Sequence, residues 1–300
     1  MTFLDELSNS IASVAASAGP SIVGIGRHVR GAGVVIADGQ VLTNAHNLRG
    51  DTVTVTFGDG RSVMGDVVGV DGDGDLAVVS VDTGGAKAID WGDGGTLAPG
   101  SPVFGAAATV GGGVRVTFGM VSAVSRAFRG PGGRRIAGSV EHTAPLAPGS
   151  SGGALLDVEG RLVGLNTNRI GEGFYLALPA DAALRTRIEA LGRGESAERP
   201  RLGVAIAPNH VARRLRRSVG LAERDGILVR GVEDGSAAEA AGVEAGDLIV
   251  SAGGRPIADA DDLHDALGAL DLPFELGLVR GAEDRSVTVG AAKGRTPGDA

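Results

Sequence analysis

The feature that most limits how this chain can fold is a long series of short apolar runs, each ended by a glycine or aspartate turn. Two of these runs, 32–36 and 41–43, flank Asp38-Gly39, a strong signal for a two-residue β-hairpin. Residues 52–57 alternate threonine with apolar side chains, which is the period of a half-buried strand. Many short strands with such turns are typical of antiparallel barrels and sandwiches. Further strands are predicted at residues 66–70, 76–81, 103–106, 114–125, 154–156, 162–166 and 174–178.

Two helical segments and a change of composition divide the chain. Apolar side chains recur at helical spacing through residues 4–18, and Pro20 follows them. Asp181 is a good N-cap for a helix that reaches about Leu191. A chain of 300 residues is long enough for roughly two domains. The predicted organisation is an N-terminal helical segment at 1–19, a β-rich domain at 20–192, a polar linker at 193–200, a second domain at 201–292 and a disordered tail at 293–300.

The second domain is predicted to be a compact α+β unit. The basic cluster at 213–217 is interpreted as the solvated face of a helix. A net charge of −8 opposes a nucleic-acid partner, because phosphate binding needs a concentrated basic surface. Strands are expected at 202–206, 226–232, 247–252, 274–278 and 286–289, and helices at 237–241 and 260–270.

No cofactor is expected from the sequence. The chain has no cysteine, which excludes disulfides, thiolate nucleophiles and cysteine-ligated metals. Residues 71–75 (Asp-Gly-Asp-Gly-Asp) superficially resemble a calcium loop. Leu76 and Asp82 occupy the positions where that loop requires glycine and glutamate. We therefore predict neither a metal nor an organic cofactor.

The first residues predict the compartment. Residues 1–7 are acidic where a secretory signal would be basic, and no long apolar run follows them. The sequence therefore predicts a cytoplasmic protein without a membrane anchor.

A serine between glycines is the first candidate for chemistry. Residues 147–154 read Ala-Pro-Gly-Ser-Ser-Gly-Gly-Ala, and glycine tolerates the positive φ that a tight turn needs. The amides of Gly149 and Ser151 can then point at one spot and hold a negatively charged oxygen beside the Ser151 hydroxyl. A flexible loop is the alternative, because the chain contains 52 glycines.

A serine hydroxyl needs a base, and the base needs a carboxylate that fixes its tautomer. His46 ends one predicted strand and Asp75 begins another, so the order along the chain is His46, Asp75, Ser151. The serine loop also fits the nucleophile elbow of α/β-hydrolases, but there the serine precedes its acid and its histidine. That esterase interpretation would require His210 or His264 and alternating helices near Ser151.

Three blocks resemble the catalytic blocks of HtrA-type trypsin-like serine proteases. They are residues 41–46 (Val-Leu-Thr-Asn-Ala-His), 75–78 (Asp-Leu-Ala-Val) and 148–153 (Pro-Gly-Ser-Ser-Gly-Gly). Residues 31–36, 119–124 and 163–167 resemble further segments of the family in the same order. The resemblance implies a mainly β fold, namely a chymotrypsin-like pair of antiparallel β-barrels with the active site between them.

The same resemblance assigns roles to single residues. Ser151 would be the nucleophile, His46 its general base and Asp75 the group that orients His46. The backbone amides of Gly149, Ser150 and Ser151 would form the oxyanion hole. The substrate pocket would be shaped by Pro145, Leu165, Asn166 and Thr167.

The second domain resembles a PDZ domain, an α+β fold that binds an extended peptide with a free C-terminus as an added strand. Residues 235–249 carry the most recognisable segment of that family. Residues 201–204 resemble its carboxylate-binding loop, and residues 262–267 its groove-lining helix. The residues predicted to bind the peptide are Leu202, Gly203, Val204, Leu263 and Leu267.

The chain departs from the HtrA pattern in the nucleophile loop. Ser150 stands where the family usually has asparagine, and Pro145 and Ala147 replace residues that shape the specificity pocket. Phe3 is the one aromatic residue near the N-terminus, where relatives use aromatic residues to form trimers, so a homo-trimer is a candidate assembly.

The resemblance therefore predicts a serine endopeptidase that acts on unfolded or damaged proteins, with polypeptide substrates and C-terminal peptides as its partners. A catalytically silent PDZ scaffold that binds peptides without cleaving them is the alternative.

Overall fold

The structure is a computed structural model and describes residues 2–130, 135–171, 173–195, 202–268 and 270–290. The chain forms two compact units, Met1–Ala197 and Glu198–Ala300. The predicted tail at 293–300 and most of the predicted linker at 193–200 lie outside the described residues.

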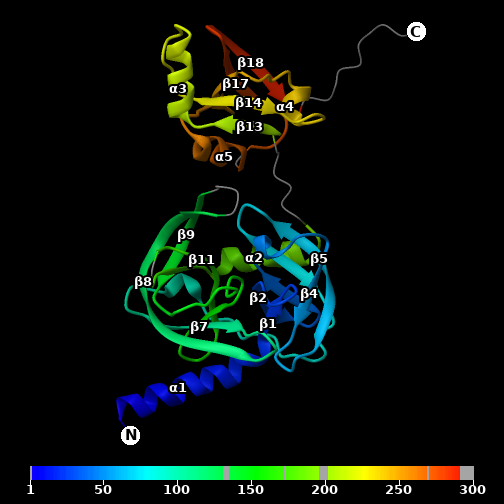
Figure 1. The fold of residues 1–300 in the computed structure, drawn as a ribbon, viewed down its shortest axis with the longest axis vertical. Coiled ribbons are helices and arrows are strands. Elements are labelled where there is room, and N and C mark those ends of the chain that lie inside the picture. The colour runs from blue at the N-terminus through cyan, green and yellow to red at the C-terminus, as the bar shows by residue number, and fades with distance from the viewer. Residues whose placement is uncertain (1, 131–134, 172, 196–201, 269, 291–300) are drawn as a thin grey trace, which may run out of the picture. The chain divides into compact units, whose positions relative to one another are not determined.

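Six strands close the first barrel of unit 1 (Figure 1): β1 (Ile22–Ile25), β2 (Gly31–Ala37), β3 (Gln40–Thr43), β4 (Thr52–Thr56), β5 (Ser62–Asp71) and β6 (Leu76–Ser80). Their order is β1-β2-β3-β6-β5-β4, and β1 pairs with β4 to complete the ring. The predicted turn at Asp38-Gly39 joins β2 to β3, and Gly39 takes a φ of +73° that glycine adopts without strain.

Six more strands close the second barrel: β7 (Pro102–Ala108), β8 (Val114–Arg129), β9 (Arg135–His142), β10 (Ala154–Leu156), β11 (Leu162–Arg169) and β12 (Tyr175–Pro179). Their order is β10-β11-β12-β9-β8-β7, and β10 pairs with β7. All neighbours in both barrels are antiparallel, which confirms the predicted double-barrel fold class.

Apolar side chains from both barrels merge into one large buried cluster. The cluster contains Leu42 and Leu76 from the first barrel, and Phe104, Leu156 and Leu165 from the second. Burial of apolar surface stabilises a fold by about 25 cal/mol per Å². This shared core therefore holds the two barrels against each other, so that loops from both can contribute to one site.

Helix α1 (Phe3–Ala18) begins at a capping box, in which the side chains of Thr2 and Asp5 each accept from the other's backbone amide. Val14 and Ala18, near its end, are buried against the barrels, while its first half projects away from them (Figure 1). Short 3₁₀ turns follow at η1 (Gly19–Ser21), η2 (Ala45–Asn47) and η3 (Gly94–Thr96). Within the described residues, no helix combines the length and apolar character needed to cross a membrane.

Helix α2 (Ala182–Gly192) closes unit 1 much as the sequence predicts. Asp181 caps it, since its carboxylate accepts from the Leu184 amide at 2.8 Å. Leu184 and Ile188 are buried in the shared core. The helix packs on β5 and β6, the two strands that lead into and out of the Asp75 turn.

Unit 2 is the predicted α+β domain. One sheet has the strand order β13-β14-β15-β17-β18, and β16 pairs with β15. Strand β13 has one neighbour in this order, so it is an edge strand. The elements are β13 (Val204–Ala207), α3 (Asn209–Ser218), β14 (Ile227–Val232), α4 (Ala237–Ala240), β15 (Leu248–Ala252), β16 (Arg255–Pro256), α5 (Ala260–Gly268), β17 (Phe274–Arg280) and β18 (Glu283–Val289).

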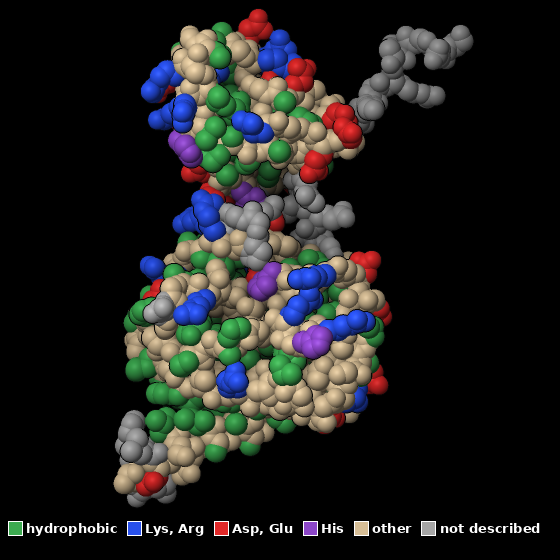
Figure 2. Space-filling view, in the orientation of Figure 1, with side chains coloured by type: hydrophobic (Ala, Val, Ile, Leu, Met, Phe, Trp, Pro, Cys, Tyr) green, Lys and Arg blue, Asp and Glu red, His purple; other side chains and the backbone are tan. Residues whose placement is uncertain are grey.

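The basic cluster at 213–217 lies on α3, a helix, but its face is not wholly solvated. Arg216 is 9% exposed and donates to the carbonyls of Ala222 and Gly281, so it braces the fold. Arg213 and Arg217 form exposed ion pairs with neighbouring carboxylates. Figure 2 shows basic side chains in separate groups on this face of the molecule, with acidic side chains among them.

Candidate active site

His46 and Asp75 meet at one end of the first barrel. His46 lies in η2, directly after β3, and Asp75 lies directly before β6, which pairs with β3. The His46 Nδ1 atom is 2.9 Å from both carboxylate oxygens of Asp75, and the His46 amide donates to Oδ1 at 3.1 Å. Asp75 is 1% exposed and His46 is 28% exposed. A buried acceptor at Nδ1 favours the tautomer that carries its proton there, which leaves Nε2 free to accept a proton.

The turn before Asp75 is held by α2. Asp75 has a φ of +56°, an uncommon conformation for a residue with a side chain. The Asp71 carboxylate accepts from the amides of Asp73 at 3.1 Å and Gly74 at 2.9 Å, and it also pairs with Arg187 of α2. Gly74 has no side chain, and the Arg187 guanidinium lies against its backbone where a Cβ atom would project. The Asp-Gly repeat therefore forms the turn that positions the Asp75 carboxylate.

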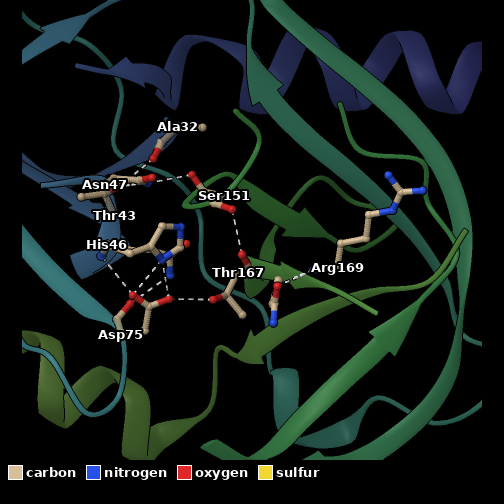
Figure 3. Close-up of polar contacts among 10 residues, drawn as sticks. Ala32, Thr43, His46, Asn47, Asp75, Ser151, Thr167 and Arg169 are labelled. Atoms are coloured by element: carbon tan, nitrogen blue, oxygen red, sulfur yellow. Dashed lines mark hydrogen bonds and ion pairs between the residues drawn. The ribbon is translucent and has the colours of Figure 1, made fainter. Parts of the chain in front are cut away.

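The second barrel also contributes to the Asp75 site. Thr167, on β11, donates its hydroxyl to Asp75 Oδ2 at 2.7 Å. Asn44 donates its side-chain amide to the Asp75 carbonyl at 2.9 Å. The carboxylate therefore accepts hydrogen bonds from both barrels (Figure 3).

Ser151 lies in the loop before β10, and its backbone is tied to the first barrel. Its carbonyl accepts from the Ala32 amide at 2.8 Å and from the Asn47 side chain at 2.9 Å. Figure 3 shows Ser151 beside the His46 ring, with its hydroxyl directed toward Thr167. Its hydroxyl donates to the Thr167 carbonyl at 2.7 Å. The structure brings the three predicted residues together, with the hydroxyl turned toward Thr167.

The backbone of the nucleophile loop offers two amides to an oxyanion. Gly149 has a φ of +86°, and a Cβ atom there would lie 2.8 Å from the Val29 carbonyl oxygen. The Ser150 amide donates to the Ala147 carbonyl at 3.2 Å and is engaged in a turn, contrary to its predicted place in the hole. Among the hydrogen bonds of the described residues, the amides of Gly149 and Ser151 have no acceptor.

A cavity of about 210 Å³ opens beside Ser151, and Asn166 and Thr167 line it as predicted. Leu165 does not, because neighbouring residues of a strand point to opposite faces and its side chain lies in the shared core. Pro145 is also outside the lining. It is exposed, and its carbonyl accepts from the Thr117 hydroxyl at 2.7 Å.

His142 lies on β9 behind this cavity and is fully buried. Its Nε2 atom is 3.1 Å from Asn166 Oδ1, and its ring stacks on Tyr175 at 5.8 Å between centroids. Asn166 donates its own amide to the Ala154 carbonyl at 2.8 Å, so Nε2 of His142 carries the proton. Burial lowers the pKa of His142 to about 4, and the hydrogen bond with Asn166 opposes that shift.

The residues predicted to bind peptide in unit 2 share one apolar cluster. Leu202 and Leu263 are buried in it, and Val204 and Leu267 pack against it. Gly203 has a φ of +72° in the turn before β13, and its carbonyl accepts from the Glu233 amide at 2.8 Å. The structure thus places the predicted loop and the predicted helix α5 on one core. Strand β13, which follows the loop, is the edge strand of the sheet.

Three functional candidates escaped the sequence analysis. Asn47 donates a hydrogen bond to the Ser151 carbonyl, Arg187 forms an ion pair in the turn before Asp75, and Arg169 lines the cavity. Asn47 and Arg187 act on partners 104 and 116 residues away, and Arg169 reaches the cavity through the fold of its loop. Within the described part of the chain, no three His, Asp or Glu side chains are grouped as metal ligands.

Comparisons with known proteins agree with this geometry. Residues 31–165 match the trypsin-like peptidase domain, and residues 228–289 match the PDZ domain. A putative serine protease, HhoA of Synechocystis sp., is 34% identical over 89% of this chain and 72% of its own length. The chain belongs to the HtrA-type serine protease family.

Other members of the HtrA-type family are similar to the chain. HhoB of Synechocystis sp. is 31% identical to the chain. The match covers 86% of this chain and 65% of the length of HhoB. A probable periplasmic DegP-like serine endoprotease of Halomonas elongata is 31% identical over 88% of the chain, which spans 56% of that relative. The solved structure of the HtrA-type protease AlgW with a tripeptide is 28% identical, with a TM-score of 0.61 over 93% of this chain and 95% of that one.

The predicted cytoplasmic location is wrong. Several of these HtrA-type relatives are named periplasmic serine endoproteases, in Halomonas elongata, Marinomonas sp. and Pseudomonas fluorescens. The prediction rested on the acidic first residues and on the lack of a long apolar run after them.

His142 should make unit 1 less stable in acid. The unfolded chain binds a proton at this histidine near pH 6.5, whereas the folded chain binds it only near pH 4. In that window the unfolded state holds more protons, so the free energy of unfolding falls as the pH falls. His142→Gln keeps a donor for Asn166 and removes the titration. The variant should lose less stability than the parent between about pH 7 and about pH 4.5, by roughly 3 kcal/mol at most.

The measurement is urea unfolding followed by the fluorescence of Trp91, the single tryptophan of the chain, which lies in unit 1. An equal loss of stability in both proteins would show that His142 is not the titrating group.

Proposed function

We propose that this HtrA-type chain is a serine endopeptidase. The observation that carries the proposal is the placement of His46 and Asp75, from one barrel, opposite Ser151 from the other, with two unengaged amides beside the serine. A nucleophile, an oriented base and preorganised donors are the groups that acyl transfer requires.

In the proposed mechanism the Ser151 hydroxyl leaves the Thr167 carbonyl and turns toward Nε2 of His46. His46 takes the hydroxyl proton as Ser151 attacks the substrate carbonyl carbon, and Asp75 stabilises the imidazolium that forms. The amides of Gly149 and Ser151 bind the oxygen that becomes negative. His46 then gives the proton to the leaving amine, and a water molecule releases the acyl group by the reverse sequence.

The proposed substrates are unfolded or damaged proteins. An extended chain can reach a hydroxyl at the junction of two barrels, whereas a folded domain cannot present its backbone there. The names of the relatives support proteolysis, although the chain spans 65% and 56% of the length of two of them. The periplasm named for several relatives supports an extracytoplasmic site of action. A homo-trimer stays a prediction.

Unit 2 is proposed to bind the C-termini of polypeptides. The edge of β13 can accept an added strand, because its one neighbour in the sheet is β14. Leu267 and Val204 are only partly buried in the adjacent apolar cluster and so can contact an apolar side chain.

A catalytically silent scaffold would need the Ser151 hydroxyl to stay on the Thr167 carbonyl when substrate is present. A probe that reacts only with an activated serine distinguishes the two functions. The esterase interpretation is opposed by the fold, since Ser151 lies between strands of an antiparallel barrel rather than at a strand-to-helix elbow.

Ser151→Ala should abolish labelling by a fluorophosphonate probe and lower casein cleavage by roughly 10⁴-fold or more, because it removes the proposed nucleophile. Ser62→Ala, at an exposed serine of β5, is the matched control and should label and cleave like the parent. Both variants should keep the thermal midpoint of the parent. Labelling that persists in Ser151→Ala would identify another nucleophile and refute the assignment.

The Ser151→Ala protein should bind peptides that end in a free carboxylate after an apolar residue, and bind the C-terminally amidated versions on the order of tenfold more weakly. The reason is that backbone amides of a PDZ loop bind the terminal carboxylate, a charged acceptor. Fluorescence anisotropy of labelled peptides measures both affinities. Equal affinity for the two forms would contradict the PDZ assignment of the 202–204 loop.

A further inference from the structure

The cavity beside Ser151 has an unequal lining. Leu146, Ala147 and Pro148 form one side of it, and Asn168, Arg169 and Tyr175 form part of the other. Its volume of about 210 Å³ is enough for one medium-sized side chain. Because the cavity adjoins the nucleophile, a side chain held in it belongs to the residue whose carbonyl is attacked.

Most polar groups of the lining are already engaged inside the protein. Asn166 uses its amide on the Ala154 carbonyl and its oxygen on His142. Thr167 uses its hydroxyl on Asp75, and its carbonyl accepts from Ser151. Both side chains are also buried, so neither presents an accessible polar group to a ligand.

The amide and charged side-chain groups that remain are hydrogen-bond donors, while the hydroxyls of Ser150 and Tyr175 can both donate and accept. The Asn168 oxygen accepts from the Arg169 amide at 2.8 Å, which leaves the NH₂ group of Asn168 free to donate. The Arg169 Nε atom donates to the Gly171 carbonyl at 2.8 Å, which fixes the guanidinium and leaves its Nη atoms free to donate. Among the described residues no carboxylate pairs with this guanidinium, and the lining contains no Asp or Glu.

We propose that this cavity selects an acidic side chain, and that Arg169 is the residue that determines this specificity. The inference rests on the proposed endopeptidase activity and names the substrate class of the same site. A glutamate fits the volume, and its carboxylate can accept from the guanidinium and from the amide of Asn168.

Other side chains fit the cavity less well. A lysine or arginine would bring a second cation beside Arg169 without a carboxylate to receive it. An aliphatic side chain would contact Leu146 and Pro148, but it would leave the donors of Asn168 and Arg169 without a new acceptor. A glutamine has the size of glutamate and lacks its charge, so it is the stringent comparison.

The test compares two fluorogenic peptides that differ only in glutamate or glutamine at the residue before the scissile bond. The full-length chain should cleave the glutamate peptide with a kcat/KM on the order of tenfold higher, because Arg169 is exposed and its attraction is partly screened. The ratio of kcat/KM for the glutamate peptide to kcat/KM for the glutamine peptide should decrease as NaCl is added, since salt weakens an exposed charge pair.

Arg169→Glu should reverse this preference, so that a lysine peptide is cleaved faster than the glutamate peptide. Arg169→Gln, a milder change, should bring the glutamate and glutamine peptides to equal kcat/KM. Arg115→Glu is the matched control, because Arg115 is exposed on β8 outside the cavity and the change in net charge is the same. The control should keep the parent's ratio.

Labelling by the fluorophosphonate probe is measured on every variant to count folded, reactive sites. Equal cleavage of the glutamate and glutamine peptides by a labelled parent enzyme would overturn the specificity inference and leave the endopeptidase assignment intact. An unchanged ratio in labelled Arg169→Gln would also overturn it. A parent that neither labels nor cleaves would overturn the proposed function, and this inference with it.

Discussion

The structure of the site depends on one buried carboxylate that both barrels bind. Asp75 receives the His46 imidazole and amide from its own barrel and the Thr167 hydroxyl from the other. A buried charge is costly unless it is fully hydrogen-bonded, so the two barrels stabilise Asp75 only when they are docked. The shared apolar core achieves that docking through Leu42, Phe104 and their neighbours. Docking of the two barrels and orientation of His46 are therefore coupled.

Ser151 is held differently from Asp75. Its backbone is fixed to the first barrel through Ala32 and Asn47, and Gly152 beside it allows this approach, since a Cβ atom there would lie 2.2 Å from the Ala32 carbonyl oxygen. Its hydroxyl, by contrast, donates one hydrogen bond, to the Thr167 carbonyl. In the proposed mechanism the hydroxyl gives up this bond in order to donate to the His46 imidazole. The backbone of Ser151 is therefore held by several contacts, whereas the orientation of its hydroxyl depends on one hydrogen bond.

The sequence predicts those parts of the site whose chemistry is local. His46, Asp75 and Ser151 each stand at a strand end or in a glycine turn, and their order distinguishes a double barrel from an elbow hydrolase. The pocket is less predictable, because Leu165 and Asn166 are neighbours in sequence and only the twist and bulges of β11 decide which one faces the cavity. Pro145 fails for a similar reason, since its loop turns it to solvent.

Contacts between distant segments could not be predicted from single-residue patterns. The ion pair of Asp71 with Arg187 joins residues 116 positions apart, and nothing near either residue indicates the other. Strand β9 lacks a regular apolar pattern, so its bounds are not evident from the sequence, yet it carries His142. In unit 2, Arg216 of α3 is buried, although it belongs to a run of arginines whose sequence predicts a uniformly exposed face.

The central claim is that a hydrogen bond from the Thr167 hydroxyl, on the second barrel, orients the Asp75 carboxylate toward His46. The most direct test is the second-order rate constant for fluorophosphonate labelling of Ser151 in Thr167→Val and Thr167→Ser. Both variants keep the backbone carbonyl, and only the serine keeps the hydroxyl. The account predicts that Thr167→Val labels on the order of tenfold more slowly than the parent, and that Thr167→Ser restores most of the rate. Labelling of folded Thr167→Val at the parent's rate would contradict it.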